Sequence, residues 1–97
     1  MNPYTISKKA TEDLEQIWRY TYFQWSEEQA DKYYHLLIEK IALIAQNTTI
    51  GRKIDYIRTG YRCFPVESHT IFYKISKNAA VTIIRILHQR MDAPSHL

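Results

Sequence analysis

A run near the end of the chain, VTIIRILHQRMD at residues 81–92, combines an apolar strand-like sequence with side chains capable of chemistry. Arg85 interrupts the apolar residues, and polar side chains then follow at every second position: His88, Arg90 and Asp92. Arg62 adds a guanidinium from an earlier strand-like segment. Arginines gathered on a sheet could hold phosphates or an acidic peptide. They could also cleave a phosphodiester, with arginine stabilising the transition state and His88 acting as general acid or base.

Period-two alternation assigns these side chains to the faces of the sheet. It predicts that Arg85 shares a face with Ile83 and Leu87, opposite Ile84, Ile86 and His88. Arg62 shares a face with Phe64 by the same rule. We expect helices to cover one face, which leaves the other for polar groups. The candidate functional or partner-binding face therefore comprises Arg62, Arg85, His88 and Arg90.

A purely structural role for the same residues is an alternative. Arg85 and Arg90 would then pair with Glu67 or Asp92, and His88 would simply end the strand. No recognised catalytic motif or metal-ligand spacing occurs, and the histidines are scattered: His35, His69, His88 and His96. We therefore assign no catalytic residue, and we expect no metal, cofactor or small-molecule ligand. The aromatic residues Trp18, Tyr22, Tyr33 and Tyr34 have the helical spacing of core residues rather than of a base-stacking platform.

The first half of the chain predicts a short strand and two helices. Tyr4–Ile6 favours a strand, and Ser7 is a plausible N-cap for a helix over 8–25. Its expected apolar stripe comprises Ala10, Leu14, Ile17, Trp18, Thr21 and Trp25. The capping box SEEQ at 26–29 begins a second helix that continues to Gln46. Its stripe comprises Ala30, Tyr33, Tyr34, Leu37, Ile41, Ile44 and Ala45, and the short link predicts an antiparallel helical hairpin.

The second half predicts three strands after an irregular connection at 47–60. The strands are expected at 61–66, 70–75 and 81–87, with turns at 67–69 and 76–80. The fold class is therefore α+β, in the order β-α-α-β-β-β, with a helical hairpin packed on a small, mainly antiparallel sheet. All 97 residues are expected to form one domain.

The charge distribution and the single cysteine indicate the kind of partner and the cellular compartment. Residues 1–50 hold five Lys/Arg and seven Asp/Glu, whereas residues 51–97 hold eight and three. The basic second half suggests an anionic partner. Cys63 is the only cysteine, which suits a reducing compartment, and no apolar run approaches the length of a membrane span. We expect a cytoplasmic protein with no membrane association.

Five segments together resemble the ParE-type toxins of the ParE/RelE superfamily, which belong to type II toxin–antitoxin modules. The segments are ATEDLEQIWRYT, WSEEQADKY, IGRKIDYIRTGYRCFPV, HTIFYKI and IIRILHQRMD, and they occur in the order and spacing of that family from about Tyr4 to Asp92. The most specific parts are GYR-x-FPV with H-x-IFY and the ending RILHQRMD.

The resemblance implies the β-α-α-β-β-β fold, a ParD-like antitoxin that wraps the toxin, and inhibition of DNA gyrase, which stalls replication. RelE-type relatives instead cut mRNA in the ribosomal A site, and they place basic residues and a C-terminal His, Tyr or Arg on this sheet. Arg62, Arg85, His88 and Arg90 match part of that pattern, but the nearest carboxylate to serve as a base is Asp55. We therefore expect a gyrase-inhibiting toxin that is not an enzyme. The alternatives are an mRNA endonuclease and a degenerate, non-toxic antitoxin-binding or co-repressor subunit.

Overall fold

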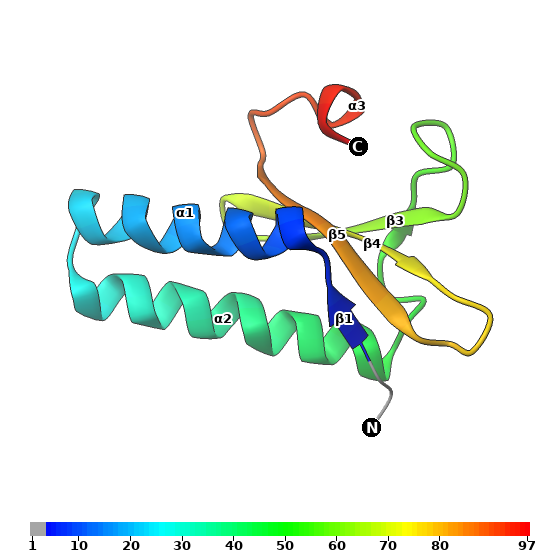
Figure 1. The fold of residues 1–97 in the computed structure, drawn as a ribbon, viewed down its shortest axis with the longest axis horizontal. Helices are drawn as coiled ribbons and strands as arrows, with labels where there is room; N and C mark the ends of the chain where they lie inside the picture. Colours follow the sequence, from blue (N-terminus) through cyan, green and yellow to red (C-terminus); the bar gives the residue numbers. More distant parts are fainter. Residues whose placement is uncertain (1–3) are drawn as a thin grey trace.

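The computed structural model describes residues 4–97 as a helical hairpin lying against a five-stranded sheet (Figure 1). Its elements are β1 (Tyr4–Ile6), α1 (Lys8–Gln24), α2 (Glu27–Gln46), β2 (Arg52–Lys53), β3 (Tyr61–Val66), β4 (His69–Ile75), β5 (Val81–His88) and α3 (Ala93–His96). The predicted α+β class and the order of its main elements are confirmed. Two short elements were not predicted: β2 lies within the expected irregular connection, and α3 follows the last strand.

Both helices begin at the serines that the sequence indicated. Ser7 Oγ accepts a hydrogen bond from the Ala10 amide at 3.0 Å, and Ser26 Oγ accepts one from the Gln29 amide at 3.0 Å. Ser7 also ties α1 to the sheet, because its hydroxyl donates to the Ile84 carbonyl at 2.7 Å. These bonds satisfy amide groups that the first helical turn leaves unpaired.

The strand order in the sheet is β1-β5-β4-β3-β2. The consecutive strands β2 to β5 pair antiparallel, as their short connections require, whereas β1 pairs parallel with β5. The turn after β3 is one residue shorter than predicted, since Val66 pairs with His69 and only Glu67 and Ser68 lie between them. Glu67 has a φ of 53°, the left-handed conformation that tight hairpin turns use.

A β-bulge in β5 changes which residues share a face. Phe72 lies opposite Arg85 but Tyr73 lies opposite Ile83, so Ile84 is an extra residue on β5. The prediction that Arg85 shares a face with Ile83 is therefore wrong. Ile83 belongs to the core on the helix side, together with Ile86, whereas Leu87 belongs to a cluster on the opposite side.

Both faces of the sheet are covered, which differs from the expected polar face. The main core lies between the helical hairpin and the sheet and includes Leu37, Ile41 and Tyr73. A smaller cluster on the other face contains Ile54, Cys63, Phe72 and Leu87, with Ala93 and Leu97 of the C-terminal segment packed against it. The C-terminal segment therefore occupies part of the face on which we expected the polar groups.

The apolar stripes of the helices are confirmed except at their aromatic residues. Ala10, Leu14, Ile17 and Thr21 of α1 are buried, but Trp25 is 76% exposed and caps the helix instead of continuing it. The hairpin extends beyond the end of the sheet, so its distal turns have no strand to pack against (Figure 1). The helical periodicity of the sequence does not show where the sheet ends beneath the hairpin.

Candidate partner-binding groove

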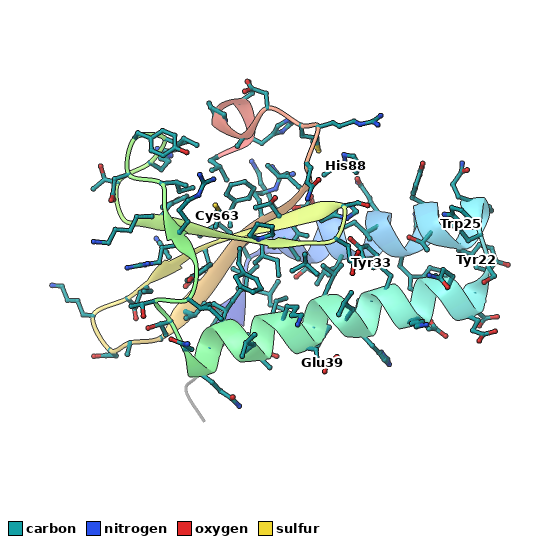
Figure 2. The ribbon with its side chains drawn as sticks, turned by 180° about the vertical axis from the view of Figure 1, so that it is seen from behind. Tyr22, Trp25, Tyr33, Glu39, Cys63 and His88 are labelled. Atoms are coloured by element: carbon teal, nitrogen blue, oxygen red, sulfur yellow. The ribbon has the colours of Figure 1, made fainter. Side chains whose placement is uncertain are left out.

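A large open groove lies where the helical hairpin extends past the ends of β4 and β5. Its volume is about 1310 Å³, and its walls include Tyr20, Trp25, Tyr33, His69 and His88. Tyr20 and Trp25 are 66% and 76% exposed. Figure 2 shows Tyr33 and His88 where the hairpin meets the sheet, and Tyr22 and Trp25 toward the far end of the hairpin. A groove of this size, with exposed aromatic walls, exceeds the roughly 300–1,000 Å³ of a small-molecule pocket and suits a protein segment.

Two histidines face each other across β4 and β5 at the base of the groove. His69 pairs directly with His88 in the antiparallel ladder, and their ring centroids lie 5.3 Å apart at 84°. Tyr33 Oη of α2 lies 2.7 Å from His69 Nδ1. His88 Nδ1 accepts a hydrogen bond from the Arg90 amide at 3.1 Å. Each ring is thus held through its Nδ1 atom.

Burial, together with the nearby His88, lowers the pKa of His69 to about 4, and Asp13 partly opposes the shift. An imidazole in this environment is neutral near pH 7 and is a weak base. Burial also raises the pKa of Tyr33, so its hydroxyl keeps its proton. The pair therefore lacks the pKa near 7 that general acid–base catalysis favours at neutral pH.

We expect the free energy of unfolding to fall as the pH is lowered from about 6.5 to about 4, with His69 as one cause. Its unfolded form gains a proton near pH 6.5, whereas the folded form resists protonation down to about pH 4. The unfolded state therefore binds more protons in this window, and stability declines with falling pH. Denaturant unfolding at pH 7.5, 5.5 and 4.5 measures this, and His69→Gln should show a smaller decline than the wild type. Equal declines would contradict the assignment to His69.

Arg85 does not point into the groove as a free cation. Its Nε and one terminal nitrogen donate to the Asp13 carboxylate at 2.8 and 2.9 Å, and the same carboxylate accepts from the Ile86 amide at 3.0 Å. Arg85 also donates to the His96 carbonyl at 3.3 Å. Hence neither Glu67 nor Asp92 is its partner, and the pair joins α1, β5 and the C-terminal segment.

The other predicted residues lie apart from one another. Arg62 lies opposite Tyr73 on the helix side of the sheet, and its guanidinium donates to the carbonyls of Gly51 and Thr49 at 2.7 and 3.3 Å. Asp55 accepts a hydrogen bond from the Gly60 amide at 2.7 Å within its own loop. Arg90 is exposed, and its side chain has no ion-pair partner within residues 4–97. Of the four candidates, only His88 and Arg90 are exposed, and only His88 of these two lines the groove.

Sequence reasoning missed three residues of this site: His69, Tyr33 and Asp13. His69 had one usable signal, because a two-residue turn at Glu67 and Ser68 places it opposite His88. Asp13 and Tyr33 lie 72 and 36 positions from the residues they contact, Arg85 and His69, and no local pattern connects them.

The structure is a small α+β domain with an open groove beside the sheet, and comparisons place it in a family. A chain titled "Chromosomal ParDE TA system from P. aeruginosa" has the same fold, with a TM-score of 0.79 and 22% identity over 91% of this chain and 96% of that one. Toxin ParE1 of Mycobacterium tuberculosis is 42% identical, covering 97% of this chain and 96% of its own length. Toxin ParE1 of Caulobacter vibrioides is 40% identical, covering 100% and 99%.

The family model described as "ParE toxin of type II toxin-antitoxin system, parDE" matches residues 4–93. The chain therefore belongs to the ParE toxin family, as the resemblance implied. Across residues 4–97, neither long helix is apolar enough to cross a membrane.

Proposed function

We propose that this protein inhibits DNA gyrase, and thereby blocks replication, and that a ParD-like antitoxin neutralises it in the cytoplasm. The observation that carries the proposal is the match of nearly the whole chain, residues 4–93, to the ParE toxin family. The toxin binds its target and performs no chemistry of its own. It needs no cofactor for this role.

The groove is the proposed site of the antitoxin. Its exposed aromatic walls at Tyr20 and Trp25 suit the apolar face of an amphipathic helix, which docks by inserting anchors one helical turn apart. The antitoxin would cover these aromatic side chains and leave the complex more soluble than the free toxin.

The geometry gives less support to the rival, a ribosome-dependent mRNA endonuclease. Arg85 is neutralised by Asp13, Asp55 is bonded to its own loop, and His69 has a pKa of about 4. Of these residues, only His88 would remain to act as general acid or base.

We expect the purified chain to abolish supercoiling of relaxed plasmid by gyrase and ATP, and to leave a defined message intact on ribosomes. Arg90→Ala should weaken the gyrase effect by roughly 10- to 100-fold, because one charge-assisted hydrogen bond is lost. Stability should change by less than about 0.5 kcal/mol, since the Arg90 side chain is exposed.

A matched His88→Ala variant separates the two activities. An enzyme that uses His88 as acid or base would lose about 10²- to 10⁴-fold in rate. Normal supercoiling, together with A-site cuts that disappear in His88→Ala, would replace our proposal with the endonuclease. Normal supercoiling and intact message, with antitoxin binding retained, would indicate a degenerate subunit.

A further inference from the structure

The groove contains a pair of imidazoles whose outward atoms have no partner in the protein. Neither the Nε2 atom of His69 nor that of His88 is hydrogen-bonded within residues 4–97, and no unpartnered side-chain nitrogen or oxygen is buried there. The Nε2 atom of His69 is therefore not buried, His88 is an exposed residue, and both residues line the groove. The hydrogen bonds at Nδ1 determine whether each Nε2 atom is a hydrogen-bond donor or an acceptor.

The proton positions follow from those bonds. The Arg90 amide donates to His88 Nδ1, so the proton of the neutral ring is on Nε2, which is a donor. When the Tyr33 hydroxyl donates its single proton to the Val66 carbonyl at 3.2 Å, its oxygen accepts from Nδ1–H of His69 at 2.7 Å. The Nε2 atom of neutral His69 is then a proton acceptor. The pair presents one donor and one site that can take up a proton.

We propose that these two imidazoles bind a carboxylate side chain of the antitoxin, and that His69 takes up one proton from solvent when the complex forms. This inference rests on the proposed function, because it concerns the antitoxin in the groove. Once protonated, His69 donates from both nitrogens, to Tyr33 and to the carboxylate, and His88 donates from Nε2. Rings 5.3 Å apart are close enough for one carboxylate to accept a bond of about 2.7–2.9 Å from each.

The groups around the pair determine how easily His69 can carry a proton. Asp13 of α1, Glu67 of the turn after β3 and Arg85 of β5 line the groove with the pair, and Tyr33 of α2 contacts His69. Asp13 is committed to Arg85, and Tyr33 is neutral. Burial and the neighbouring His88 both disfavour a positive charge on His69 in the free protein, which lowers its pKa. A carboxylate supplies the missing countercharge and raises that pKa.

The structure places the expected contact with an acidic partner residue at the histidine pair rather than at the arginines. The sequence suggested that Arg62, Arg85 or Arg90 would meet acidic residues of the antitoxin, but the guanidiniums of Arg62 and Arg85 are bonded within the protein. The histidine pair offers free hydrogen-bonding groups in the groove instead.

Calorimetry with the antitoxin encoded by the adjacent open reading frame tests the inference. Titrations at pH 7.5 and 5.5, each in two buffers of different ionisation enthalpy, report both affinity and proton uptake. For a pKa of about 6.5 in the complex, His69 is mostly protonated at pH 5.5 and mostly neutral at pH 7.5. Proton uptake should therefore approach one proton only at pH 5.5, where binding should also be about tenfold tighter. His69→Gln and His88→Gln should each weaken binding by roughly 10- to 100-fold, and His69→Gln should remove the proton uptake. The matched control His96→Gln, on the exposed C-terminal segment, should behave like the wild type.

NMR titration of the His69 ring in the wild type gives a readout that no folding defect can mimic. Its pKa should rise from about 4 in the free protein to above 6 in the complex. A complex that forms with no proton uptake and an unchanged His69 pKa would overturn the inference and leave the antitoxin partner intact. Failure of the two proteins to bind at all would overturn the antitoxin part of the proposed function as well.

Discussion

Replacing Leu37 or Ile41 with alanine will lower the free energy of unfolding by about 2–5 kcal/mol. Both side chains are 0% exposed and lie one turn apart on α2, in the core between the helices and the sheet. Each substitution removes buried methyl groups and leaves a cavity that close-packed neighbours fill only in part. The loss is a large fraction of the roughly 5–15 kcal/mol that stabilises a small domain.

Leu43→Ala is the matched control for these variants. It makes a similar change on the same helix, but Leu43 is 36% exposed. We expect a loss of less than about 1 kcal/mol, measured by urea unfolding with the slope unchanged. If Leu37→Ala and Ile41→Ala unfold at the same urea concentration as Leu43→Ala, the assignment of the buried face of α2 is wrong.

Asp13→Ala will destabilise the protein by about 2–4 kcal/mol, the second large effect we expect. The Asp13 carboxylate accepts two bonds from Arg85 and one from the Ile86 amide, and the two side chains are only 11% and 15% exposed. Its removal leaves a guanidinium and a strand amide without their acceptor, in a site where water replaces it poorly.

A double-mutant cycle isolates this ion pair from its surroundings. Arg85→Ala should cost less than Asp13→Ala, because the carboxylate keeps its bond to Ile86, and the double variant should cost less than the sum of the two. Glu15→Ala, an exposed acidic residue on the same helix, should change stability by less than about 0.5 kcal/mol. Strictly additive losses would show that Asp13 and Arg85 do not stabilise each other.

The ion pair also affects how toxicity variants are interpreted. Because Arg85 connects α1, β5 and the C-terminal segment, its loss weakens the fold before it weakens any contact with a partner. Reduced toxicity in Arg85→Ala is therefore weak evidence for a binding role. Arg90 and His88 are better probes, because both are exposed and project from the end of the sheet.

The sequence by itself determined the elements and their order. Ser7 and Ser26 mark the helix starts, Leu37 and Ile41 mark the buried face of α2, and short connections make β3, β4 and β5 antiparallel. These features depend on interactions between residues a few positions apart, which a single sequence displays directly. The five quoted segments likewise sufficed to identify the ParE toxin family.

Only the tertiary structure decided which side chains meet. The extra residue Ile84 shifts the face of every later residue in β5, and the hairpin that overhangs the sheet leaves Trp25 exposed. The pairing of Arg85 with Asp13, 72 positions away, turned a predicted binding residue into a structural one, and the ladder brought His69 to His88. Such contacts depend on strand register and on the packing of helices against strands. A bulge that moves the register by one residue reverses the faces with little change in the local pattern, so the sequence alone could not reveal the site.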